Sequence, residues 1–437
     1  MAVTVSATHT QPVRTKTPLT TAQKKGFLAA YAGWTLDGMD AFIYALVLVP
    51  ALRDLLPASG IQPTGPNIGA WGSRLFAMFL FGWGLSMAWG VIGDRIGRVR
   101  ALALTILTYS LFTLLCGLVT NIWQLMFLRV MCGVGLGGEQ PVGSTFVAEA
   151  LPEDRRVKAA GLLHTGYYAG FLLASIANYF IGANYGWRWM FAFGGLPAIF
   201  VGWIMSNVKE SHKFEEMKKT ARPSMKQSFA ALFTPQFKKR TIVMSLIYLV
   251  SIIGQWAGSI YVPTAITQIA LRGGAVAADA ARMASYGGMV LAIGTVIGCL
   301  LAPILAERFG RRVAMAMFLS LLCVTTGVAF GWAFFLTMNA LQIFFIMTFL
   351  LGLAGANFAM YTLWLPELYP TSSRGSGMGF ISSIGRFAGV AMVFLIAAGV
   401  DHFGNIGTPI ALTSIILFLG LFLLPFAVET KGQPLPR

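Results

Sequence analysis

The chain has 437 residues, of which 56% are hydrophobic and 11% charged, and its mean hydropathy of +0.71 excludes a soluble globular domain. The formal net charge of +16 does not indicate nucleic-acid binding, because the basic residues gather in alternate connections between apolar runs. The four cysteines lie inside apolar runs without metal-ligand spacing, so neither a metal site nor another bound cofactor is expected. We therefore predict an all-α protein embedded in a lipid bilayer, since a helix satisfies its own backbone there.

Apolar runs of about 20 residues or more predict twelve transmembrane helices. They cover residues 27–52, 69–92, 101–120, 122–146, 159–183, 187–208, 241–269, 283–306, 313–336, 339–365, 377–401 and 405–428. The polar stretch 209–240 contains nine Lys or Arg residues and separates the sixth run from the seventh. The predicted parts are an N-terminal tail (1–26), a six-helix bundle (27–208), a linker (209–240), a second six-helix bundle (241–428) and a C-terminal tail (429–437).

The distribution of basic residues predicts the orientation of the chain in the membrane. Lys and Arg cluster in residues 14–25, 95–100, 155–158, 209–240 and 308–312, whereas the intervening connections carry few charges. Cytoplasmic loops of membrane proteins are enriched in these residues. We therefore expect a multi-pass protein of an inner (plasma) membrane with both termini in the cytoplasm.

The two halves of the chain repeat each other at three places, in the same order and on the same side of the membrane. The paired segments are 90–98 with 303–311, 149–156 with 367–374, and 210–211 with 429–430. Three ordered repeats indicate duplication of a six-helix unit, an architecture in which the substrate site lies between the halves near the bilayer midplane.

This architecture resembles the major facilitator superfamily, from about Gly26 to Pro436. The motifs Gly90-x-x-x-Asp94-Arg95-x-Gly97-Arg98 and Arg129-x-x-x-Gly133 carry the resemblance. Within the superfamily the chain is most similar to the sialate and aromatic-acid proton symporter families, through the segments 37–40, 129–139, 185–188 and 385–386. It departs from the sugar-porter pattern, in which a glutamine pair is typical of the seventh helix, because only Gln255 stands there. It also lacks the Gly-Pro element that is typical of the fifth helix in drug antiporters.

Asp37 and Asp40 place two carboxyl groups on one face of the first span, about 15 and 20 Å from its cytoplasmic end. Charges at such depth are costly, so they are either functional or satisfied by neighbouring helices. Arg129 in the fourth span lies at the depth of Asp40 and is its expected partner. The resemblance implies that this pair couples transport to protons. Glu139 and His164 lie closer to the cytoplasm and either relay the proton or have a structural role.

Arg386 in the eleventh span has no acidic residue near it in its own helix, because the one acid of that span, Asp401, stands at its other end. It is expected either to bond helix carbonyls or to bind a carboxylate that arrives with the substrate. Arg74, near the outer end of the second span, either joins the substrate site or snorkels to the membrane surface. Side chains that could line the substrate cavity, although most such side chains only pack, include Tyr44, Gln255, Trp256 and Tyr361.

The resemblance implies that the repeated segments form a cytoplasmic gate. Asp94 is expected to face the N-terminal end of the eleventh helix, near Arg374. The residues expected to form the gate are Gly90, Asp94, Arg95, Gly97, Arg98, Glu149, Arg156, Glu307, Arg308, Arg311, Glu367 and Arg374.

Together these features predict a monomeric secondary transporter that imports a small organic anion, a carboxylate, with the proton as coupling ion. The alternatives are a proton-coupled sugar or neutral-solute porter and a non-transporting sensor on the same fold. An enzyme is not expected, because the sequence contains no nucleophile–base constellation. Aromatic acids, sialic acid and short mono- or dicarboxylates all remain open as the anion, as do the proton stoichiometry and the choice between symport and exchange.

Overall fold

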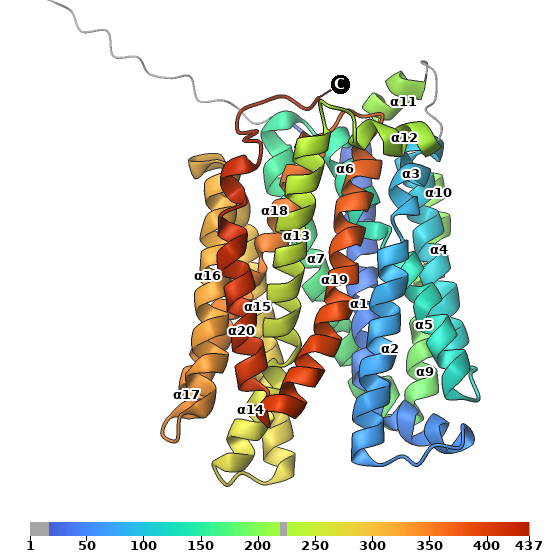
Figure 1. The fold of residues 1–437 in the computed structure, drawn as a ribbon. Helices are drawn as coiled ribbons and strands as arrows, with labels where there is room; N and C mark the ends of the chain where they lie inside the picture. The colour runs from blue at the N-terminus through green and yellow to red at the C-terminus, as the bar shows by residue number, and fades with distance from the viewer. Residues whose placement is uncertain (1–16, 219–224, 437) are drawn as a thin grey trace, which may run out of the picture.

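The computed structural model describes residues 17–218 and 225–436, and no strand occurs in these two ranges. The helices lie side by side in one bundle (Figure 1). The first described residues and the end of the chain lie at the same end of the bundle, since Thr17 bonds Asp154 and Arg156 bonds Gln433. We call this end the terminal face and the opposite end the far face.

The first half supplies six spans, several of them broken into two consecutive helices. These are α1 (Thr21–Ala58), α2 (Gly65–Leu85) with α3 (Ala88–Ile96), α4 (Arg98–Cys116), α5 (Ile122–Leu136) with α6 (Glu139–Ala150), α7 (Glu153–Ala177), and α9 (Trp187–Phe193) with α10 (Pro197–Asn207). A π-helical segment (Asn178–Gly182) and α8 (Ala183–Tyr185) connect α7 to α9.

The second half repeats this arrangement after two short linker helices at the terminal face, α11 (His212–Lys218) and α12 (Met225–Leu232) (Figure 1). Its spans are α13 (Lys238–Ile260) with α14 (Val262–Arg272), α15 (Ala277–Phe309), α16 (Arg311–Gly331), α17 (Ala340–Gly355) with α18 (Asn357–Trp364), α19 (Arg374–Phe403) and α20 (Gly407–Leu421). Short 3-10 segments cover Ala333–Phe335, Leu365–Glu367 and Leu424–Phe426.

Within the described ranges, nine stretches are long and apolar enough to cross a bilayer, or ten when the bent helix α1 is included. The spans α5–α6 and α7 complete the twelve. They carry ionisable residues along their length, including Arg129, Glu139 and His164, which lowers their hydropathy. Both spans are held inside the bundle, α5 against α2 and α7 against α1.

The first helix is longer than its apolar run predicts. It begins at Thr21, because Thr20 forms a capping box with Gln23: each side chain bonds the backbone N–H of the other residue. It continues to Ala58, past Pro50. Hydropathy marked only residues 27–52, since the first turns of α1 are polar and lie at the terminal face.

Glycine crossings bring helices of one half into backbone contact. Gly38 of α1 lies against the carbonyl of Tyr167, and Gly170 of α7 lies against that of Thr35, so either Cβ would overlap backbone. Close approach through small residues is a common way of packing membrane helices. The crossing fixes the part of α1 that carries Asp37 and Asp40 against α7.

The same device appears at equivalent places of the two halves. Gly82 and Gly133 join α2 to α5, and Gly294 and Gly352 join α15 to α17. Each half has its own buried core, and the half-buried ring of Trp256 packs against both cores. Trp256 therefore marks the interface between the halves.

Candidate functional site

The centre of the interface holds a buried guanidinium group, that of Arg386 on α19. Its Nη2 donates to Oε1 of Gln140 on α6 at 2.9 Å, and its Cζ lies 4.4 Å from the ring centroid of Trp83 on α2. Among the described residues, no hydrogen-bond partner is found for its Nη1. Arg386 therefore crosses from one half to the other and keeps one donor group available.

Asp37 faces this arginine from the other half. Its side chain is fully buried, and neither carboxyl oxygen accepts a hydrogen bond from any described residue. Arg386, Glu139 and Asp40 all lie within electrostatic range of it. Arg386, which has no acid near it in its own helix, thus lies near one on α1, a neighbour that the sequence did not indicate.

The predicted ion pair between Asp40 and Arg129 is not formed in this structure, which corrects that expectation. Both side chains are fully buried, and neither forms a hydrogen bond within the described ranges. The Arg129 guanidinium instead lies between two rings, 4.4 Å from the centroid of Tyr44 and 4.5 Å from that of Phe79. Cation–π attraction holds it there, while Asp40 remains within its electrostatic range.

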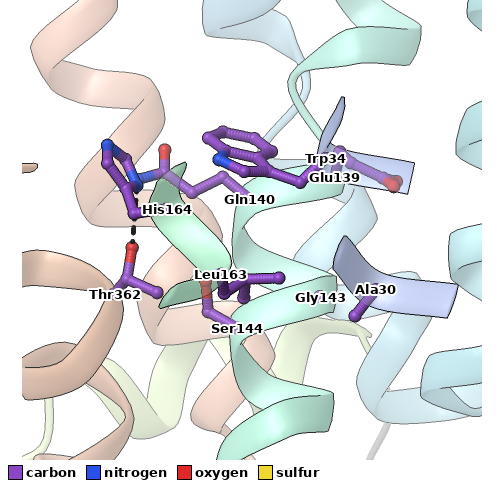
Figure 2. A pocket seen from close by; sticks show the side chains of 9 residues that line it. All are labelled: Ala30, Trp34, Glu139, Gln140, Gly143, Ser144, Leu163, His164 and Thr362. Atoms are coloured by element: carbon purple, nitrogen blue, oxygen red, sulfur yellow. Dashed lines mark hydrogen bonds between the residues drawn. The ribbon is translucent and has the colours of Figure 1, made fainter. Parts of the chain in front are cut away.

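Glu139 and His164 line one small cavity on the terminal side of this cluster (Figure 2). Glu139 accepts a hydrogen bond from Thr105 at 2.9 Å through one oxygen, and its other oxygen is buried without a partner among the described residues. Nδ1 of His164 lies 3.3 Å from the hydroxyl of Thr362 on α18, across the interface. The cavity therefore brings polar groups of both halves together.

Aromatic rings line the interface beside Arg386. Trp256 on α13 packs 5.3 Å from Phe76 and 6.4 Å from Trp83, measured between ring centroids. Tyr361 on α18 shares a hydrogen bond of 2.7 Å with Ser251 and packs 4.6 Å from the ring of Tyr248. Two of the aromatic residues expected to line a cavity, Trp256 and Tyr361, thus lie in the central region.

Two candidate substrate residues have no described contact with Arg386 or Asp37. Arg74 is exposed, about 13 Å along α2 from Trp83, and lies over the ring of Trp71 at 5.0 Å. Gln255 is buried in the second half against Gly355.

One further residue of this region, Gln140, was not among the expected site residues, whereas Tyr248 was one of the aromatic residues that could line a cavity. Gln140 bonds Arg386, and the hydroxyl of Tyr248 donates to the same amide oxygen at 3.2 Å. The signal available in the sequence was a Glu-Gln pair, Glu139 and Gln140, inside an apolar run.

Asp94 of α3 lies at the N-terminal end of α19 in the other half. It accepts hydrogen bonds from the backbone N–H of Gly375 at 3.0 Å, and from the N–H and hydroxyl of Ser376 at 2.7 and 2.5 Å. Gly90 lies so close to Gly375 that a Cβ would overlap its carbonyl oxygen. The two halves therefore touch backbone to backbone at this point.

A buried network surrounds Glu149 at the terminal face. Arg98 binds both of its oxygens at 3.1 Å, and Arg374 of the second half donates to Oε1 at 2.6 Å. Two guanidinium groups from different halves thus share this one buried carboxyl group. Glu149 therefore joins the halves.

The second half contains the counterpart of this network, around Glu367. Arg311 binds both of its oxygens at 3.0 and 2.8 Å, and Arg156 of the first half donates to Oε1 at 3.1 Å. The hydroxyls of Ser211 and Thr430 complete the two networks at equivalent positions. Two ion pairs thus join the halves at the terminal face. In Arg374–Glu149 the second half supplies the arginine, and in Arg156–Glu367 the first half supplies it.

Two carboxylates that were not among the expected gate residues also lie at the terminal face. Gly97, with φ of 112°, ends α3, and Glu210 accepts hydrogen bonds from the first two N–H groups of α4 at 2.9 and 2.8 Å. Gly310, with φ of 92°, and Glu429 repeat this arrangement at the start of α16. The sequence did contain a signal for these two carboxylates, since Glu210 of the first half recurs as Glu429 in the second.

Three expected gate residues do not enter either network. Arg95, Glu307 and Arg308 are all exposed at the terminal face. Glu307 is the counterpart of Asp94, but α7 carries its own acids, Glu153 and Asp154, in its first turn and needs none from the other half. The two networks, around Glu149 and Glu367, are therefore equivalent in their ion pairs. The contact that Asp94 makes with a helix start has no counterpart at Glu307.

Comparisons with known proteins place the chain among transporters. The sequence pattern of the family described as Major Facilitator Superfamily matches residues 30–389. A protein of Cupriavidus pinatubonensis, named "Probable 4-methylmuconolactone transporter", is 30% identical over 94% of this chain and 91% of its own. The niacin transporter NiaP of Acinetobacter baylyi is 26% identical, with coverage of 92% and 93%, and the sialic acid transporter NanX of Escherichia coli is 24% identical, with 94% and 95%.

Solved structures show the same fold. The proton:xylose symporter XylE superposes with a TM-score of 0.74 at 18% identity, over 95% of this chain and 98% of that one. The human organic anion transporter MFSD10 superposes with a TM-score of 0.71 at 15% identity, over 92% and 99% of the two chains.

Proposed function

The chain belongs to the major facilitator superfamily, as a transporter rather than an enzyme, and from this premise we propose that it imports a small organic anion together with protons. The observation that carries the proposal is the buried Arg386, which bridges the halves and has one nitrogen without a partner among the described residues. A carboxylate would complete its hydrogen bonds, since the guanidinium fork matches carboxylate geometry.

The balance of charges in the central cluster supports proton coupling. Asp37, Asp40 and Glu139 are three buried acids, and Arg129 and Arg386 are the two guanidinium groups among them. The fully ionised cluster carries one negative charge, and an anionic substrate would add a second. Because unpaired charge is costly in such surroundings, binding of the anion favours uptake of a proton by one of these acids.

The relatives support a carboxylate over a sugar. Niacin and sialic acid, for which two relatives are named, both carry a carboxylate. The resemblance to the xylose symporter, at 18% identity, concerns the fold. The rings of Trp83 and Trp256 beside Arg386 suit a substrate with a flat or apolar part next to its carboxylate.

The basic connections support an orientation in which the terminal face is cytoplasmic. The protein would then lie in the inner membrane as a monomer, with both termini inside the cell. The two ion pairs and Asp94 would keep its cytoplasmic side closed, and rocking of one half against the other would open it.

The test is calorimetric binding of matched ligands, such as nicotinate beside nicotinamide and benzoate beside benzamide, to the purified transporter. We expect the wild type to bind a carboxylate and reject its amide. Arg386→Ala should weaken carboxylate binding by about 10- to 100-fold, because a hydrogen bond between charged groups is lost, and Arg386→Lys should lie between. Arg74→Ala, at an exposed arginine, is the control and should bind normally. Normal binding by both Arg386 variants would show that another residue recognises the charge of the substrate carboxylate.

A further inference from the structure

Two small cavities lie in series along the contact of α6, α7 and α18. The first is lined by Trp34, Glu139, Gln140, Ser144, His164 and Thr362, together with apolar residues. The second extends toward the terminal face, where its lining includes Arg156 and Glu367 of the gate. Ser144 and Thr362 line both cavities, so these two hydroxyl groups lie where one cavity meets the other.

Each cavity is bordered by residues with buried polar atoms that lack a hydrogen-bond partner among the described residues. In the first these are Nε1 of Trp34 and Oε1 of Glu139, and in the second they are Nε and Nη1 of Arg156, the latter 3.7 Å from a carboxylate oxygen of Glu153. Each cavity has room for roughly one water molecule. A polar cavity of this size with unpartnered donors and acceptors is where an ordered water is expected.

We propose that each cavity binds one water molecule, and that the two waters connect the central carboxyl groups to the gate. The waters and the polar side chains around them form a file of hydrogen-bonding groups. This file runs from Glu139 through the first water to His164, Thr362 and Ser144. It then continues through the second water to Glu367 and Arg156. It is the route by which the coupling proton leaves, so the inference rests on the proposed function. Each water, hydroxyl and imidazole of the file accepts one proton and passes on another, and Glu367 releases the last one at the terminal face, which balances the proton taken from Glu139. Arg156 cannot accept a proton and only orients the second water.

His164 acts in this file by its hydrogen bond. Its Nδ1 shares the 3.3 Å contact with Thr362 from α18, and its ring packs 5.7 Å from that of Trp34 on α1. The acids that line the two cavities are Glu139 and Glu367, and the cation is Arg156. Exchange of protons along hydroxyls, waters and a neutral imidazole requires no charged histidine.

Trp34 interrupts the file in the conformation seen here. In the view of Figure 2 its indole ring lies between the carboxyl group of Glu139 and the imidazole of His164. An uninterrupted file would let protons cross without substrate, which a coupled transporter has to prevent. Rotation of the Trp34 side chain on opening of the gate would connect the two parts.

The test uses proteoliposomes in which a pH gradient drives net uptake, measured beside counterflow of labelled for unlabelled substrate. Thr362→Val and Ser144→Ala each remove one hydroxyl group and add no bulk to the side chain. Each should lower pH-driven net uptake by about tenfold, because a proton-transfer step is lost, and leave counterflow within about twofold. Thr362→Ser retains the hydroxyl and should behave as wild type. Thr348→Val, at a buried threonine of α17 that bonds only its own helix, is the matched control.

The outcomes separate the inference from the proposed function. If the wild type itself shows no pH-driven uptake, the proposed function fails. If the wild type is driven by the gradient and both variants without the hydroxyl match it, the proton leaves by another route and the inference fails. Equal loss of net uptake and counterflow in these two variants, as in misassembled protein, would also overturn it.

A second measurement tests the interruption by Trp34. Trp34→Ala should admit protons into liposomes in the absence of substrate, measured with an internal pH dye, and Trp34→Phe should remain tight. The double variant Trp34→Ala with Thr362→Val should lose most of the leak. A leak that persists in the double variant would place the path outside the two cavities.

Discussion

Asp40 is buried in α1 without a hydrogen bond from the described residues, and Arg129 lies near it without direct contact. This is the arrangement expected of an acid that gains and loses a proton as the site fills and empties. If Asp40 carries the coupling proton, Asp40→Asn resembles the permanently protonated acid. The variant should still exchange substrate in counterflow and should not accumulate it under a pH gradient, because no proton is released.

Proteoliposome uptake beside counterflow measures both quantities. Asp54→Asn, which alters an exposed acid paired with Arg188 at 2.5 Å on the far face, is the control and should accumulate substrate normally. Asp37→Asn should be milder if Asp37 only tunes its neighbour, and equally severe if the two acids share the proton. Accumulation by Asp40→Asn would assign the proton to Asp37 or Glu139.

At the scale of elements, the start of α19 depends on a residue of the other half. Its N-cap residue, Ser373, makes no side-chain capping bond, and Asp94 of α3 receives the first free N–H groups instead. A carboxylate there also opposes the positive end of the helix dipole. The cap is therefore made only while the two halves are closed at the terminal face.

Asp94→Asn should weaken this closed state, since a hydrogen bond to a charged acceptor contributes about 1.5–3 kcal/mol. Cysteine labelling at the terminal mouth should become faster in Asp94→Asn. Glu307→Gln changes the exposed counterpart in the second half and should leave labelling unchanged. Equal labelling rates in the two variants would show that the capping contact does not keep the gate closed.

At the scale of the whole molecule, the closed face is held by two ion pairs that cross in opposite directions. Removing one partner of a buried pair typically costs about 3–5 kcal/mol, because the other charge stays buried. Glu149→Gln removes the carboxylate that Arg98 and Arg374 share, and Glu367→Gln removes the one that Arg311 and Arg156 share. Among the described residues, Arg98 then keeps only Asp94 and Arg156 only Glu153, whereas Arg374 and Arg311 lose their ion pair. Each variant should therefore shift the population toward opening at this face.

Spin labels introduced by Arg95→Cys and Arg308→Cys, two exposed positions in different halves, report the separation at the terminal face. We expect longer label distances in Glu149→Gln and in Glu367→Gln, and the longest in the double variant. Glu153→Gln, at a largely exposed acid 3.7 Å from Arg156, is the control. Distances that do not change in any variant would show that other contacts hold the face closed.

The sequence by itself determined the membrane class, the twelve spans and the two repeated halves, and it predicted most of the charged residues that join the halves at the terminal face. These follow from local properties: the length of an apolar run, the bias of basic residues between connections, and motifs that recur in the same order. It also singled out Asp37, Asp40, Arg129 and Arg386, because a charge inside an apolar run is conspicuous wherever the helix is placed.

Only the tertiary structure decided which of these groups face one another. The neighbour of Arg386 is Asp37 of the other half, and Arg129 lies between two rings instead of on Asp40. Depth along a helix is readable from sequence, whereas rotation about its axis depends on packing against distant segments, such as the crossing at Gly38 and Gly170. For the same reason Asp94 is buried at a helix start while its repeat, Glu307, is exposed: the two helices they approach begin with different residues.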